Sequence, residues 1–428
     1  MGRDRVLGIP NTRSLAPVKC KLEICDRSWV SDPLGRVRSV KFLHTSDWHV
    51  GRTIRGRSRA DEHRAVLAEI VEIAHAEAVD VVLVVGDLFD TAAPTAESEK
   101  IVFQALLNLA ATGATVLVLA GNHDNARRLQ AVEPLLELGR VVTRPVFVGA
   151  DDGGVVDLTS LDGSEHAKVA VLPFLSQRHV VKAADLMELD AADHGHIYDS
   201  HVQGLLNGLC AGFTEETVNV VAAHLTVSGG RLGGGERAAH TVFDYEVQAA
   251  SFPATAQYVA LGHLHRRQQV PGGGQIHYCG SPLQLDFGET KDIKSVSVVE
   301  AHAGSPVAVR DVELLQGRRL QSLVGTLDEL RELAADGEDA WLKVTVQEAP
   351  RVGLADEVRA LFPGAVDVVV ERPEAESAVS GDSPERLSRT GRGPAELFGG
   401  FLAERGIEDP ALVALFAEVL SEIEGVSS

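Results

Sequence analysis

Residues 81–90 of the chain read Val-Val-Leu-Val-Val-Gly-Asp-Leu-Phe-Asp. Five consecutive apolar residues predict a short strand that is buried on both faces, as is typical of the interior of a parallel sheet. Residues 61–78 before it and 95–112 after it carry apolar side chains at helical spacing, with Thr95 and Ser98 as candidate caps at the start of the second helix and Gly113 as a helix stop. This alternation of helices and strands predicts βαβ units and an α/β fold.

The same pattern, an apolar run followed by polar residues, occurs at four other places. The polar strings are Asp47-Trp48-His49, Gly121-Asn122-His123-Asp124, His224 and Gly262-His263-Leu264-His265. Ligands in α/β sheets gather at the carboxyl ends of strands, so we expect these side chains to converge. A buried strand end has no packing use for such groups, because each costs about 1–3 kcal/mol when its hydrogen bonds are unmade.

Carboxylate, imidazole and amide oxygen ligands suit a borderline-hard divalent ion such as Mn²⁺ better than an all-thiolate site would. Two such ions about 3.5–4 Å apart are a standard device for cleaving phosphate esters. An isolated Asp-x-His is weak evidence of metal binding, and the prediction rests on the ordered combination. The sequence therefore predicts a binuclear phosphoesterase centre, with Mn²⁺ as the favoured metal and Mg²⁺ as the alternative.

The overall charge argues against nucleic-acid binding by bulk electrostatics, because the net charge of the 428-residue chain is −21. A basic surface would have to be local or come from a partner. One basic stretch follows the first metal motif and comprises Arg52, Arg55, Arg57, Arg59 and Arg64. It is either a solvated loop or a grip on a phosphate backbone, and the first four arginines are the candidate DNA contacts.

The four cysteines are too few and too scattered for a disulfide framework, and their spacing does not predict a zinc site. No stretch is apolar enough to span a membrane, and none reads as a signal peptide. We expect a cytoplasmic protein.

The chain divides into five parts by composition and periodicity. Residues 1–39 read as a disordered extension or a mis-called start, 40–299 as the catalytic domain, 300–370 as a smaller unit with strands at 307–312, 340–346 and 366–370, 371–394 as a linker, and 395–424 as two short amphipathic helices. Because helices as short as those two are marginal alone, they must pack on the catalytic body or on a partner. Within the catalytic domain, residues 176–217 read as a loop-rich insertion.

The ordered motifs resemble those of the calcineurin-like metallophosphoesterases. A finer resemblance, to the SbcD family of nuclease subunits, is carried by residues 42–52 (Phe-Leu-His-Thr-Ser-Asp-Trp-His-Val-Gly-Arg) and 278–289 (Tyr-Cys-Gly-Ser-Pro-Leu-Gln-Leu-Asp-Phe-Gly-Glu), with Lys294-Ser295-Val296 shortly after. The second string contains no predicted metal ligand, so phosphoesterases at large have no shared reason to carry it. The resemblance is close over residues 40–300 and holds only in outline elsewhere.

The resemblance implies a four-layer α/β/β/α sandwich with a small α+β capping domain and C-terminal helices. It assigns Asp47, His49 and His265 to the first ion, Asn122, His224 and His263 to the second, and Asp87 to a bridge between them. His123 would stabilise phosphate charge or protonate the leaving 3′ oxygen, and Asp124 would orient His123. Two roles stay open for Asp90. It could support the Asp87 loop or an imidazole ligand, or it could simply stabilise a turn.

The implied activity is that of a hydrolase in DNA repair, recombination and replication. It would act with an SbcC-type coiled-coil ATPase, as a homodimer within a heterotetramer at the nucleoid, as a 3′–5′ exonuclease on duplex ends and an endonuclease on hairpins and single strands. One alternative is a stand-alone phosphoesterase for a small nucleotide or phosphodiester, against which the cap region and tail helices stand. Another is a non-catalytic DNA-end-binding subunit, against which the intact ligand set stands.

Overall fold

The computed structural model describes residues 39–175, 191–234, 236, 246–333 and 339–372, together with Phe398, Leu402 and Phe416. The predicted extension before residue 39, almost all of the predicted linker, and the C-terminal helices apart from those three residues lie outside the described residues. In the described part of the chain, no helix combines the length and apolarity needed to cross a bilayer.

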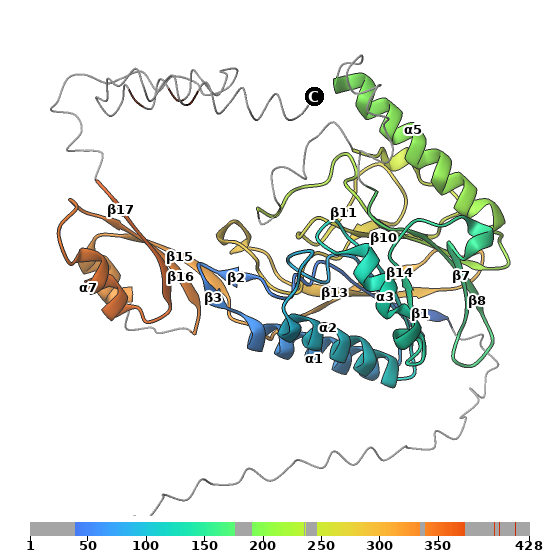
Figure 1. Cartoon of the computed structure of the whole chain (residues 1–428), viewed down its shortest axis with the longest axis horizontal. Coiled ribbons are helices and arrows are strands. Elements are labelled where there is room, and N and C mark those ends of the chain that lie inside the picture. The colour runs from blue at the N-terminus through green and yellow to red at the C-terminus, as the bar shows by residue number, and fades with distance from the viewer. Residues whose placement is uncertain are drawn as a thin grey trace, which may run out of the picture.

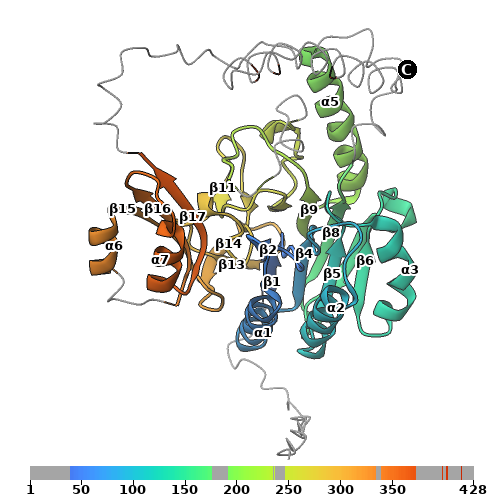
Figure 2. The same ribbon diagram turned by 60° about the vertical axis from the view of Figure 1, so that its left-hand side comes forward.

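The first of two six-stranded sheets contains the predicted βαβ units. Its order is β14 (Ala308–Glu313), β13 (Ser295–Ala301), β1 (Val40–Thr45), β4 (Val81–Val85), β5 (Thr115–Leu119) and β6 (Val141–Arg144). The last four strands are parallel, and β13 and β14 extend the sheet in antiparallel pairing. The outer face is covered by α1 (Ala60–Ala76), α2 (Ala96–Ala111) and α3 (Ala126–Glu137), as Figure 2 shows.

The second sheet packs face to face against the first. Its order is β11 (Gln268–Gln269), β12 (Ile276–Tyr278), β10 (Tyr258–Gly262), β9 (Val218–His224), β8 (His166–Leu172) and β7 (Val155–Thr159), and α5 (Ala191–Leu209) packs on its outer face. Short 3₁₀ turns lie at Ala150–Asp152, Cys210–Gly212, Ala249–Ser251 and Phe287–Glu289.

Strand β4 shows how the layers are held together. Its Val81, Leu83 and Val85 lie in the core between the sheets, whereas Val82 and Val84 lie in the core under the helices. Alternate side chains of a strand point to opposite faces, so a wholly apolar strand fills two cores at once. The predicted α/β/β/α sandwich is confirmed.

The predicted start and end of α2 are also those of the structure. The side chain of Thr95 accepts a hydrogen bond from the backbone amide of Ser98 at 3.2 Å, and the helix ends at Ala111, with Thr112 as its C-cap. Gly113 follows with φ +101°, a conformation that glycine adopts without steric cost.

Two predicted assignments were wrong. Residues 191–209 of the expected loop-rich insertion form α5, whose buried Tyr198, Val202 and Leu206 recur every four residues. Gly195, Gly204 and Gly208 within it disfavour helix and hid that period. The strand expected at 307–312 in the small unit is β14, which belongs to the first catalytic sheet.

The small unit therefore begins at β15. Parallel strands β15 (Leu320–Gly325), β16 (Trp341–Gln347) and β17 (Ala365–Glu371) pack with α6 (Leu327–Leu333) and α7 (Leu354–Leu361) around their own core. This unit, orange to red in Figure 1, lies beside the ribbon of β2 (Thr53–Ile54) and β3 (Arg57–Ser58). Contact is made by Arg55 Nε with Asp367 at 2.8 Å and by Trp341 Nε1 with Glu62 at 2.8 Å.

Candidate metal centre

Four of the seven predicted ligands sit on strained backbone. Of the seven non-glycine residues with positive φ in the described part of the chain, four are predicted ligands: Asp47 (52°), His49 (45°), Asp87 (51°) and His263 (103°). Such conformations are costly for residues with a Cβ and cluster at functional sites. The loops after β1 and β4 hold each other in place, because the amides of Asp47 and His49 donate to the carbonyls of Gly86 and Asp87, each at 3.0 Å.

The glycines that precede the ligands leave no room for a side chain. A Cβ on Gly121 would lie 2.1 Å from Oδ1 of Asp87, and one on Gly86 would lie 2.3 Å from Nδ1 of His224. A Cβ on Gly262 would lie 1.9 Å from the carbonyl oxygen of Val85. The two sheets approach so closely at this edge that only glycine fits between their ligands.

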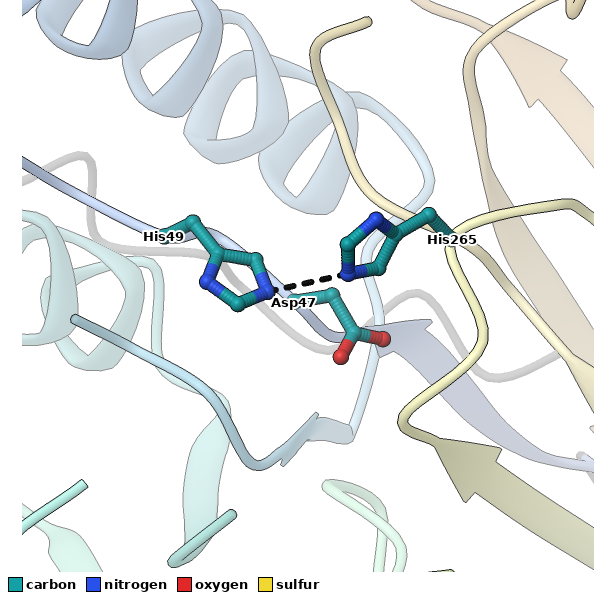
Figure 3. Close-up of side chains that lie close together, drawn as sticks. All are labelled: Asp47, His49 and His265. Carbon is teal, nitrogen blue, oxygen red and sulfur yellow. Dashed lines mark hydrogen bonds between the residues drawn. The ribbon is translucent and has the colours of Figure 1, made fainter. Parts of the chain in front are cut away.

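The first group of converging side chains consists of Asp47, His49 and His265. All three are buried, and their ligand atoms lie within 4.8 Å of one another. Figure 3 shows the two imidazoles facing each other beside the carboxylate, with Nε2 of His49 and Nε2 of His265 3.1 Å apart. Nδ1 of His49 is buried without a hydrogen-bond partner among the described residues. Two imidazoles and a carboxylate that converge in a buried place are a donor set that fits a divalent ion.

The second group consists of Asp87, His224 and His263, again buried and within 4.8 Å. Oδ1 of Asn122 lies 3.0 Å from Nε2 of His224 and 2.9 Å from Nδ1 of His263, so the amide faces the same point. Oδ2 of Asp87 lies 3.5 Å from Nε2 of His224 and 3.6 Å from Nε2 of His49. That oxygen lies between the two groups, where a bridging carboxylate would be.

Two imidazoles have an acceptor beside Nδ1, the ring nitrogen that faces away from the ligand group. His224 donates its Nδ1–H to the carbonyl oxygen of Val85 at 2.9 Å, which leaves Nε2 for an ion. Nδ1 of His265 lies 3.2 Å from Oε1 of Glu289. A hydrogen bond from the distal ring nitrogen is the usual support of a ligating histidine.

One pair of residues, Asp87 and His224, dominates the electrostatics of the two groups. Burial alone raises the pKa of Asp87, but the adjacent His224 outweighs it and holds that pKa far below its usual range. Burial lowers the pKa of His224, yet Asp87 raises it by more, to about 9. Burial and the charge of His224 lower the pKa of His263 to about 3. Metal ligation would therefore require the release of the His224 proton.

His123 lies at the rim of both groups. Its backbone amide donates to Oδ1 of Asp87 at 2.8 Å, and its Nδ1 lies 2.8 Å from the carbonyl oxygen of Asp90. The orienting role of Asp124 toward His123 stays a prediction. The carboxylate of Asp124 accepts from the amides of Gly121 at 2.9 Å, Phe89 at 3.1 Å and Leu88 at 3.2 Å. Asp124 thus ties two ligand loops together, and burial raises its pKa to about 7.

The four candidate DNA-contacting arginines differ in exposure. Arg59 is buried, with its guanidinium bonded to Glu62 and to the carbonyl of Gln284, so its predicted DNA contact was wrong. Arg52 pairs with Asp90 at 3.1 Å, whose carboxylate also lies 3.8 Å from Nδ1 of His49. Arg55 pairs with the small unit as described above, and Arg57 is exposed.

The structure adds two carboxylates that the sequence reasoning missed. Glu289, from the string without a ligand, contacts His265 as described. Oε1 of Glu236 accepts from the backbone amide of His265 at 3.0 Å and from that of Gly233 at 2.8 Å, which ties the backbone at Gly233 to the site. His44, by contrast, is a buried structural residue, bonded to Tyr258 and Leu261.

Comparison with known proteins agrees with this geometry. The family model for calcineurin-like phosphoesterases matches residues 40–267. The chain is 31% identical to the SbcD protein of the SbcCD nuclease from Bacillus subtilis (strain 168), covering 90% of this chain and 99% of that protein. It is 35% identical to the Rhodobacter capsulatus protein of that name (62% and 67% covered) and 30% identical to the Escherichia coli K12 protein (72% and 78%). The chain therefore belongs to the calcineurin-like phosphoesterases and, within them, to the SbcD family of nuclease subunits.

Proposed function

We propose that this metal-dependent phosphoesterase cleaves the phosphodiester backbone of DNA, as a 3′–5′ exonuclease on duplex ends and an endonuclease on hairpins and single strands. The observation that carries the proposal is the convergence of two buried ligand groups on one carboxylate, Asp87, in a chain that spans 99% of a relative named as part of a nuclease. That full-length match does not favour the stand-alone alternative.

The proposed ligand roles follow the two groups. Asp47, His49 and His265 would hold the first ion, Asn122, His224 and His263 the second, and Asp87 both. Two divalent ions, which we propose to be Mn²⁺, supply an activated water and neutralise phosphate charge when bound. The donor set of imidazole, carboxylate and amide oxygen supports that metal without excluding Mg²⁺.

The protein's own contribution to catalysis would come from His123. With Nδ1–H donated to the carbonyl oxygen of Asp90 and the backbone amide donated to Asp87, the ring is oriented at the rim of the two ligand groups. There it would donate a hydrogen bond to the phosphate or hand a proton to the leaving 3′ oxygen. Asp124 would act indirectly, by holding the loops that carry Asp87 and Asn122.

The proposed partner is an SbcC-type ATPase, because the relatives are named as subunits of SbcCD complexes. The predicted C-terminal helices would provide the attachment. Within them, Phe398 and Phe416 stack with ring centroids 4.1 Å apart, and Leu402 is buried. A homodimer within a heterotetramer, working at the nucleoid, completes the proposal. Arg52, Arg55 and Arg57 remain the proposed DNA contacts.

Cleavage assays on purified full-length protein test this function. Labelled hairpin DNA and blunt duplex DNA are incubated with and without Mn²⁺, beside a small chromogenic phosphodiester. We expect Mn²⁺-dependent DNA cleavage, with products that shorten from the 3′ end of the duplex. Efficient hydrolysis of the small diester with no DNA cleavage would instead support the small-substrate alternative.

A further inference from the structure

The string Tyr278–Glu289 supplies no metal ligand, but it packs around the predicted ligand His265. The amide of Ser281 donates to the carbonyl oxygen of His265 at 3.1 Å. Gly280, with φ +77°, lies so close that a Cβ there would be 2.6 Å from that same carbonyl oxygen. The string therefore forms the wall behind His265 and fixes its backbone.

Glu289 closes this wall with a fully buried carboxylate. Its Oε1 lies 3.2 Å from Nδ1 of His265, and its Oε2 accepts from Nζ of Lys294 at 2.7 Å and from the amide of Leu285 at 3.1 Å. Nζ of Lys294 also donates to the carbonyl oxygen of His265 at 3.0 Å and to Ser281 Oγ at 2.9 Å. Lys294 thus donates hydrogen bonds both to Glu289 and to His265, the residue beside Glu289.

A buried ion pair of this kind is weak evidence of a purely stabilising role, because desolvating two charges offsets most of their attraction. Its geometry has a specific consequence instead. A carboxylate can only accept a hydrogen bond, so it forces the proton of His265 onto Nδ1 and leaves a lone pair on Nε2. Nε2 is the atom that faces Nε2 of His49 at 3.1 Å, within the first ligand group.

We propose that Glu289, held by Lys294, is the positioning residue that fixes the tautomer and orientation of His265 for the first metal ion. The proposal rests on the proposed ligand role of His265. It accounts for the string without a ligand and for Lys294 five residues beyond it, which no metal ligation explains.

Glu289→Gln tests the proposal, because it keeps the shape and removes the charge. A glutamine NH₂ turned toward Nδ1 would move the imidazole proton to Nε2, where it blocks ligation. Mn²⁺ titration of metal-free, full-length protein, with free Mn²⁺ read by electron paramagnetic resonance, measures both sites. We expect one of two Mn²⁺ ions to bind roughly 10–100-fold more weakly and the other to be unchanged.

Two further variants separate positioning from folding. Glu289→Gln leaves Lys294 buried without its carboxylate, so the double variant with Lys294→Met removes that charge too, and it should show the same selective loss of one ion at an unchanged fold. Glu165→Gln is the matched control, because Oε1 of Glu165 also lies 3.2 Å from a histidine, Nδ1 of His302, but at the opposite end of the second sheet. It should bind both ions normally.

The outcomes are distinct. Wild-type binding of both ions by a folded double variant would overturn the positioning role of Glu289 while leaving the metal centre intact. Fewer than two Mn²⁺ ions in the wild-type protein would overturn the proposed metal assignment itself, and the role of Glu289 with it.

Discussion

The imidazole of His123 stands edge-on to that of His49, with ring centroids 4.7 Å apart and planes at 88°. The residue that we propose to act on the substrate thus lies directly beside a predicted ligand of the first ion, while its own Nδ1 lies 2.8 Å from the carbonyl oxygen of Asp90. The contact with the His49 ring fixes the position of the His123 ring relative to the first ligand group, and this does not require His123 to bind a metal ion.

His123→Leu should therefore separate catalysis from metal binding. The variant should bind two Mn²⁺ ions and DNA as the wild type does, because its ligands are intact. Its turnover should fall by about 10²–10⁴, the usual cost of losing a catalytic acid or charge-stabilising donor. Single-turnover cleavage of labelled DNA measures this, and a rate within threefold of wild type would contradict the role.

Arg59 and Arg57 should respond in opposite ways to substitution. Arg59→Met should destabilise the fold by roughly 3 kcal/mol, because Glu62 and the carbonyl of Gln284 lose a buried partner. Arg57→Met, at an exposed position, should leave stability within about 0.5 kcal/mol and weaken DNA binding at low salt. Urea unfolding and a salt titration of DNA affinity provide the two readouts. Equal stability of both variants would refute the structural role of Arg59.

Gly121→Ala should damage the metal centre although it replaces no ligand. The added methyl group would meet Oδ1 of Asp87 at 2.1 Å and push the shared carboxylate aside. We expect Mn²⁺ affinity to fall by roughly 10–100-fold. Gly212→Ala, where a Cβ meets nothing within 4 Å, is the control and should bind metal normally. Calorimetric Mn²⁺ titration distinguishes them, and matching affinities would show that the loop can give way.

Acid should destabilise the protein through His44. Burial first, and the charges of Arg267 and His277 next, lower its pKa to about 3. The unfolded chain takes up a proton below about pH 6.5 but the folded protein does not, so this contribution is complete above pH 6.5 and is lost as the pH falls toward 3. Between pH 7 and pH 5 the loss should be about 2 kcal/mol. His44→Asn should flatten the pH dependence in chelator-treated protein, as measured by urea unfolding, and an unchanged slope would exclude His44 as its source.

Strands β1, β4, β5, β9 and β10 were predictable because each apolar run is long enough to identify a strand and ends at a polar string. The convergence of Asp47, Asp87 and His263 follows because each lies just after the carboxyl end of such a strand. Glu289 was not predictable as a partner of His265, since 24 residues separate them in sequence and only the fold brings them together. The burial of Arg59 likewise depends on Gln284, from a distant segment.

The central claim is that Asp87 serves two ions, and the direct test is the metal content of Asp87→Ala. Full-length wild-type and variant proteins are loaded with Mn²⁺, desalted and analysed by mass spectrometry, with DNA cleavage measured on the same samples. We predict two ions per wild-type chain, and in the variant loss of both ions together with DNA cleavage. Two ions retained by Asp87→Ala, or undiminished cleavage, would contradict the account.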